Sequence, residues 1–244
     1  MAASLPWFPC VGLVLGAALY GLTLLAGLSP WGAWPQGAAF VVVAGGVFLT
    51  RGLHLDGLAD AADAWGSLAS REKMLSIMKD SRVGTFGVLA LVLILGAKWV
   101  AIARLVESGT AVWIVAAYVI SRTAQVELAV ALPYARAEGG TARGFIKDAR
   151  GVHRLVAWAL ALVIVAVVCG PVGAGALVGG WLVARALAWR FMKMLGGVTG
   201  DILGATSELV ETAILLACAA AGSHLVAHTG WASVMDAIRG GFAT

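Results

Sequence analysis

The chain has 244 residues, of which 61% are hydrophobic and only 12% are charged, and its net charge is +4. A soluble domain carries about 25% charged residues because its surface faces water, so this composition excludes an ordinary soluble enzyme and a disordered chain. The small net charge does not indicate nucleic-acid binding, and the three cysteines lie in apolar runs without paired spacing, which argues against a disulfide framework. We therefore expect an all-α polytopic membrane protein.

Seven segments are apolar enough to cross about 30 Å of hydrocarbon, which takes roughly 20 residues. They are residues 10–28, 36–53, 85–106, 111–132, 155–169, 174–189 and 202–226. No linker or internal repeat divides them, so a single integral-membrane domain over 1–244 is expected. The tail is predicted to add a short interfacial helix at 231–238.

Lysine and arginine gather in every second connection between these spans, in residues 51–82, 136–154 and 185–193. The alternate connections, near Pro30, near Ser108 and near Pro171, contain neither residue type over their short length. By the positive-inside rule the basic connections face the cytoplasm. This predicts a multi-pass protein of the inner cell membrane with its amino terminus inside and its carboxyl terminus outside.

The stretch 53–65, directly after the second span, carries three aspartates, Asp56, Asp60 and Asp63. Their i, i+4, i+7 spacing places them within about 60° of one helical face. Neighbouring carboxylates repel one another unless a cation lies among them, and hard oxygen ligands suit Mg²⁺ or Mn²⁺ shared with substrate phosphates. His54 adjoins this motif as a further candidate. The alternative is a solvated acidic face, although no Lys or Arg is interleaved.

A second candidate group opens the seventh span. Asp201 and Glu208 are seven residues apart and share a helical face, so we expect them to add metal ligands. Gly197, Thr199 and Gly200 lead into the amino terminus of this helix, which suits a phosphate group. The alternative is a Gly-rich connector whose acids cap the helix, which would explain Asp201 but not Glu208.

Basic side chains near these acids are candidates for binding phosphate. They are Lys79 and Arg82, with Ser81 between them, then Arg122 within the fourth span and Arg136 at its cytoplasmic end. Asp80 lies in the same turn and is a candidate cap, ligand or catalytic acid. The alternatives are a routine helix entrance for residues 77–87, an ion pair between Arg122 and an acid inside the membrane, and an interfacial position for Arg136.

These residues suit the transfer of a phosphate-linked group at the cytoplasmic face. A metal ion would neutralise a diphosphate and stabilise the leaving phosphate, while a carboxylate deprotonates an attacking hydroxyl. The alternative is a cation- or proton-coupled transporter, which also uses acids within the membrane. Against a transporter, the acids gather at one face and the sequence has no inverted repeat.

Four strings resemble the signature segments of the cobalamin-5′-phosphate synthase family, also called adenosylcobinamide-GDP ribazoletransferases. They are GLHLDGLADAADAWG, REKMLSIMKDSRVGTFGVLAL, PYARAEGG and GGVTGDILGATSELVE, in this order along the chain. The resemblance implies that adenosylcobinamide-GDP and α-ribazole, or its 5′-phosphate, are joined with release of GMP, and that Mg²⁺ is required.

The same family is similar to the CDP-alcohol phosphotransferases, whose acids bind a divalent metal. Asp56, Asp60 and Asp63 fall on the matching positions, and with Asp80 they are the catalytic residues that the resemblance implies. Membrane lipids and a second copy of the chain are further expected partners.

Overall fold

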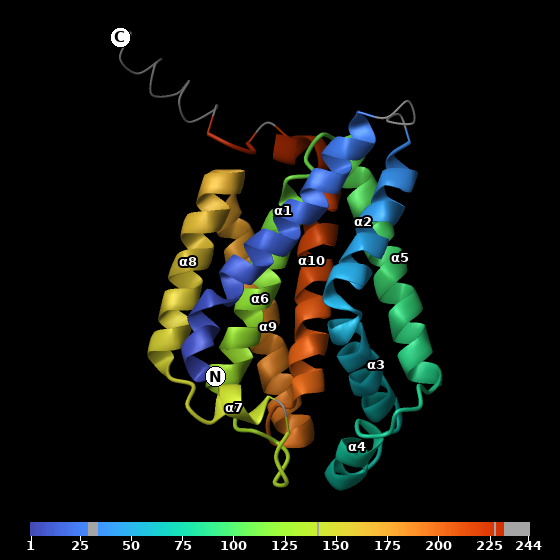
Figure 1. Ribbon diagram of the computed structural model, residues 1–244, viewed down its shortest axis with the longest axis vertical. Coiled ribbons are helices and arrows are strands. Elements are labelled where there is room, and N and C mark those ends of the chain that lie inside the picture. Colours follow the sequence, from blue (N-terminus) through green and yellow to red (C-terminus); the bar gives the residue numbers. More distant parts are fainter. Residues whose placement is uncertain (29–33, 141, 227, 232–244) are drawn as a thin grey trace.

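The computed structural model describes residues 1–28, 34–140, 142–226 and 228–231, and every regular element in them is helical. In chain order these elements are η1 (Ala2–Trp7), α1 (Phe8–Gly27), α2 (Pro35–Thr50), α3 (Leu53–Gly66), α4 (Arg71–Ile77), α5 (Thr85–Glu107), α6 (Trp113–Ala131), α7 (Arg143–Ile146), α8 (Gly151–Cys169), α9 (Gly173–Leu195) and α10 (Gly200–Val226). The long helices form one bundle, with α6 and α10 in its middle and α8 and α5 on opposite flanks (Figure 1). Beyond Trp231, the helix expected at 231–238 lies outside the described residues.

Within the described residues, five stretches of helix are long and apolar enough to cross a membrane: Ala2–Gly27, Thr85–Glu107, Trp113–Ala131, Gly151–Cys169 and Gly200–Gly222. The pair α2 and α3, bent by 90°, makes a sixth if it is one broken span. The all-α polytopic membrane class is thus confirmed. The expected count of seven is reached only with α9, which has 23 residues but carries Arg185, Arg190 and Lys193.

The two central helices are covered by the others. In the most apolar part of each span, 89% of the residues of α6 and 72% of those of α10 are buried. The share is 22% in α5, in α8 and in the span formed by η1 and α1. Two glycines let α1 lie directly on α6: a Cβ on Gly12 would be 2.5 Å from the Tyr118 carbonyl oxygen, and one on Gly16 would be 2.7 Å from the Cα of Val115. This small-xxx-small spacing is the packing that membrane helices use in place of a hydrophobic driving force.

The second span ends earlier than expected because the chain turns sharply after Thr50. Arg51 and Gly52 both adopt left-handed backbone conformations, with φ of 53° and 67°. Helix α3 then starts at Leu53 in a new direction and packs between α5 and α10. The acidic stretch is therefore carried by a separate helix.

The three basic connections meet at one end of the bundle. The connection from α3 to α5, that from α6 to α8 and that from α9 to α10 all lie at the lower end in Figure 1, together with η1. The connections from α5 to α6 and from α8 to α9 lie at the opposite end. Among the described connections, those rich in Lys and Arg and those without them, which alternate along the sequence, thus lie at two opposite ends of the molecule.

Candidate active site

Helices α3 and α10 touch through glycine, which brings the two acidic segments together. A Cβ on Gly57 would lie 2.6 Å from the Asp201 carbonyl oxygen, and one on Gly204 would lie 3.2 Å from the Cα of His54. Any side chain at Gly57 would force the helices apart. The first turn of α10, with Asp201, therefore lies directly on the acidic face of α3.

Four carboxylates lie at the contact between α3 and the first turn of α10. Asp56 is exposed, whereas Asp60, Asp63 and Asp201 are half-buried. The carboxylate of Asp60 is repelled by the negative charges of Asp201, Asp56 and Asp63, in decreasing order of strength. The positive charge of Arg136 partly offsets this repulsion. The structure thus brings together the aspartates of the predicted face and the first acid of the seventh span.

Asp63 has a contact that its spacing did not reveal. Its carboxylate accepts hydrogen bonds from the backbone N–H groups of Gly84, at 2.6 Å, and Gly87, at 2.8 Å. Asp63 therefore caps the amino terminus of α5, which has no cap of its own because Gly84 lacks a side chain. A Cβ at either glycine would lie 2.5 Å from this carboxylate, so the two glycines leave room for it.

Arg136 closes one side of the site. Its Nη2 donates to Asp201 Oδ2 at 2.7 Å and to the carbonyl oxygen of Met78 at 3.3 Å. It thereby ties the turn after α4 to the first turn of α10. The ion pair neutralises one carboxylate of the cluster.

Backbone pairing fixes Arg136 in this position. The N–H of Val198 donates to the Pro133 carbonyl at 2.9 Å, and the N–H of Ala135 donates to the Val198 carbonyl at 2.9 Å. Arg71 clamps the same junction, since its side chain donates to the carbonyl oxygens of Leu195, at 2.6 Å, and Ala135, at 2.8 Å. Sequence reasoning did not single out Arg71, and its position in a basic loop carries no signal for this role.

Of the three residues expected to contact phosphate through the Gly-rich segment, Gly200 alone lines the cavity that also contains Asp56 and Asp201. Gly197 is buried, and a Cβ there would lie 2.3 Å from the Pro133 carbonyl oxygen. Thr199 is also buried; its Oγ1 donates to Asp201 Oδ2 at 3.2 Å and accepts from the N–H of Ile202 at 3.3 Å. Gly197 therefore permits the close backbone approach, and Thr199 caps α10 and orients Asp201.

A cavity of about 350 Å³ opens beside the carboxylates. Its lining includes Asp56, Asp201, His54, Gln125 and the aromatic residues Phe8 and Phe145. Phe8 and Phe145 pack edge to face with ring centroids 5.9 Å apart. This mixture of apolar walls and a few polar groups is typical of a site for an organic ligand.

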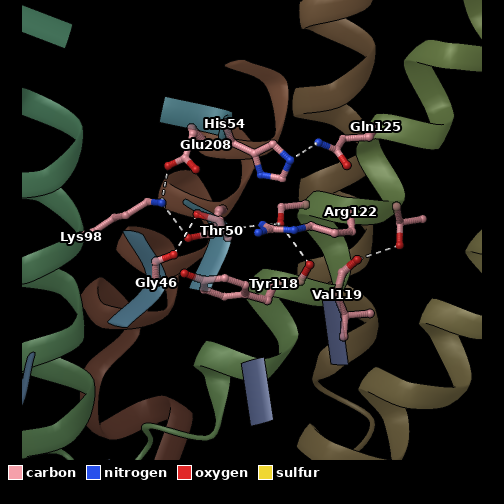
Figure 2. A network of polar contacts seen from close by, with 12 residues as sticks. Gly46, Thr50, His54, Lys98, Tyr118, Val119, Arg122, Gln125 and Glu208 are labelled. Atoms are coloured by element: carbon pink, nitrogen blue, oxygen red, sulfur yellow. Dashed lines mark hydrogen bonds and ion pairs between the residues drawn. The ribbon is translucent and has the colours of Figure 1, made fainter. Parts of the chain in front are cut away.

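Gln125 was not predicted, although a polar residue within a membrane span is itself a signal. Its Nε2 donates to the Leu203 carbonyl at 3.2 Å and lies 3.1 Å from His54 Nε2. Figure 2 shows the two side chains directed toward each other. Gln125 therefore links the centre of α6 to the wall of the cavity.

The turn after α4 carries its charges in local pairs. Three hydrogen bonds from the Arg82 side chain, with one from its backbone N–H, lower the pKa of Asp80 to about 2. Lys79 pairs with Glu138 and holds the pKa of that carboxyl below its usual range. Ser81 is exposed. These residues lie at the end of the bundle that carries the cavity, but none of them lines it.

Two expected site residues lie elsewhere. Arg122 Nη1 donates to Glu211 Oε2 at 2.6 Å, and Lys98 of α5 pairs with both Glu211 and Glu208. Figure 2 shows the side chains of Lys98 and Glu208 directed toward each other. All four side chains are at most 8% exposed. The charges of Arg122 and Glu208 are therefore neutralised inside the bundle, in agreement with the alternative of an internal ion pair for Arg122.

The donor types at the site fit a hard divalent cation, since Mg²⁺ prefers carboxylate oxygens. Asp56, Asp60 and Asp201 supply them from two helices that touch. Over the described residues, no three His, Cys, Asp or Glu side chains already surround a common point that suits a metal. Asp201 instead accepts from Arg136, and Asp63 from the start of α5. The chemistry of the ligands fits Mg²⁺, and their coordination stays a prediction.

Comparison with known proteins decides the family. The sequence model of cobalamin-5-phosphate synthase matches residues 1–219. The chain belongs to this family. The segments that resembled its signatures lie in α3, in α4 with the start of α5, in residues 133–140 and at the start of α10. All four meet at the end of the bundle that carries the acids.

Relatives in this family are similar over most of their length. A Chlorobaculum parvum protein named adenosylcobinamide-GDP ribazoletransferase is 46% identical over 217 residues, covering 87% of this chain and 84% of that protein. Proteins of the same name from Chlorobium phaeovibrioides and Pseudomonas syringae are 46% and 41% identical, each covering 90% of this chain and 88% of its own length. No solved structure matches the chain.

Proposed function

We propose that this chain is an adenosylcobinamide-GDP ribazoletransferase. It joins α-ribazole, or its 5′-phosphate, to adenosylcobinamide-GDP and releases GMP. Membership of the family and the names of the relatives support this activity. The observation that carries it is the contact of α3 with the first turn of α10, which gathers acidic side chains beside a cavity of about 350 Å³.

In this proposal Asp56, Asp60 and Asp201 would hold Mg²⁺, with Asp63 beside them. When bound, the ion would neutralise the diphosphate and stabilise the departing phosphate. One carboxylate of the cluster accepts the proton of the attacking hydroxyl. Arg136 orients Asp201 through their ion pair.

The basic turn near the cavity has a supporting role. Lys79, Ser81 and Arg82 contact the part of the nucleotide diphosphate that extends out of the cavity, and Asp80 holds Arg82 in place through their ion pair. We do not extend the site to Arg122 and Glu208, because their charges are used within the bundle. The similarity to CDP-alcohol phosphotransferases stays a prediction.

An experiment that removes Mg²⁺ and adds it back tests this function. Purified protein in detergent is expected to release GMP from adenosylcobinamide-GDP only when both α-ribazole and Mg²⁺ are present. Removal of the ion with a chelator should reduce release to background, and fresh Mg²⁺ should restore it. Metal-independent release would contradict the proposal. If proteoliposomes that contain the protein built up a solute gradient across their membrane and released no GMP, the alternative of a cation- or proton-coupled transporter would be favoured.

We further propose that the site faces the cytoplasm across the inner cell membrane. The basic connections support this orientation, and the substrates are cytoplasmic. With Cys10, Cys169 and Cys218 replaced, a single cysteine at Ser67, near the site, should resist an impermeant thiol reagent in intact cells. One at Glu107, which is exposed at the opposite end, should react. Labelling at Ser67 with protection at Glu107 would invert the orientation.

A further inference from the structure

A groove of about 810 Å³ lies on the flank of the bundle between α6, α8 and α9, apart from the candidate active site. Apolar side chains from the two outer helices form its walls, among them Leu155, Leu162, Leu177 and Val178. Trp158 and Trp181 also line it. Tryptophans of this kind are enriched where a membrane protein meets the interface.

A charged cluster lies in this groove. Glu127 of α6 is only 2% exposed, and it accepts from Trp158 Nε1 at 3.0 Å. Arg154 and Arg185 approach the same carboxylate with their Nη1 atoms at 3.4 and 3.3 Å. Two guanidinium groups from two helices thus share one buried carboxylate.

The cluster has an excess of one positive charge. The side chains of Arg154 and Arg185 are 41% and 47% exposed, so part of each guanidinium remains open toward the groove. On a flank that faces lipid, an unbalanced charge is costly unless an anion or water meets it. Among the residues that the structure describes, no other acid lines the groove.

The position of Arg154 shows at what depth in the membrane the charged cluster lies. It lies in the first turn of α8, at the end of the bundle where the basic connections gather. Lipid headgroups lie at this level of a membrane protein, and basic pockets between membrane helices on this side are suited to anionic headgroups. The apolar walls then continue along α8 and α9 toward the membrane interior.

We propose that this groove binds an anionic phospholipid. Its phosphate contacts the guanidinium groups of Arg154 and Arg185, and one acyl chain lies along Leu162 and Val178. Glu127 holds the two arginines in a fixed orientation. The site is separate from the acidic face of α3, since Glu127 and Gln125 lie on different faces of α6 and contact different helices.

Lipid binding by the purified protein tests this inference. Native mass spectrometry in a mild detergent would compare phosphatidylglycerol with phosphatidylcholine of the same acyl chains. We expect preferential retention of phosphatidylglycerol, with each of R154Q and R185Q lowering its affinity about fivefold. R185K should keep most of the preference. R190Q should keep all of it, because Arg190 lies on the same helix but stacks on Trp65, away from the groove.

A further variant separates a lipid site from a structural cluster. E127Q keeps a side-chain oxygen that can still hold the arginines in place but removes the negative charge that competes with the lipid phosphate, so it should raise the affinity for phosphatidylglycerol. A purely structural cluster would instead lose stability with every lipid and show no selectivity. Equal binding of both lipids, full competition by inorganic phosphate, or a second protein copy in place of the lipid would each overturn the proposal.

Discussion

Replacement of Asp56 by Asn is expected to reduce GMP release by about 1,000-fold, because a metal ion contributes several kcal/mol to stabilising a phosphoryl transition state and each 1.36 kcal/mol is a factor of ten. Asp56 is exposed and lines the cavity, so the loss of its charge should leave the folded bundle intact. The variant should also need more Mg²⁺ for half-maximal activity. Initial rates over a Mg²⁺ titration measure both effects.

A matched control is D148N, which removes an exposed acid from a loop at the same end of the molecule. Its rate and Mg²⁺ requirement should equal those of the unchanged protein. Retention of a third or more of the activity by D56N would remove Asp56 from the metal site. If both variants lost activity together, net charge at this end, rather than ligation, would be responsible.

Local spacing predicted the acidic face well because three aspartates at i, i+4 and i+7 must share a face of any helix. The same spacing does not show which neighbour each carboxylate meets. Asp63 caps α5 because the fold places the N–H groups of Gly84 and Gly87, which belong to a later segment of the chain, next to its carboxylate. A tertiary contact of this kind has no signature in the spacing of the acids.

The second acidic group shows the limit of the same argument. Asp201 and Glu208 do share a face, but seven residues place Glu208 about 10 Å deeper along the helix. It meets Lys98, a lysine within an apolar span, which is a signal that sequence reasoning did not use. Arg136 was predicted as a residue at the membrane interface or a ligand contact, and its ion pair with Asp201 depends on the backbone pairing of residues 133–135 with Val198.

Replacement of Glu211 by Gln is expected to lower the free energy of unfolding by about 3–5 kcal/mol, the usual effect of removing one partner from a buried ion pair. Glu211 is 1% exposed and contacts both Lys98 and Arg122. With Glu208, the four side chains balance two positive against two negative charges. The variant leaves one positive charge uncompensated in the centre of the bundle, where little water can reach it. Reversible denaturation in mixed micelles measures the change.

The paired variant R122Q/E211Q restores the balance of charge, since Lys98 and Glu208 still neutralise each other. It should therefore lose less stability than the sum of the two single variants, as expected for residues that interact directly. E107Q removes an exposed partner of Arg104 instead and should change stability by no more than about 1 kcal/mol. An E211Q protein as stable as E107Q would mean that Lys98 and Arg122 find water or other partners, and that the central ion pairs do not hold α5, α6 and α10 together.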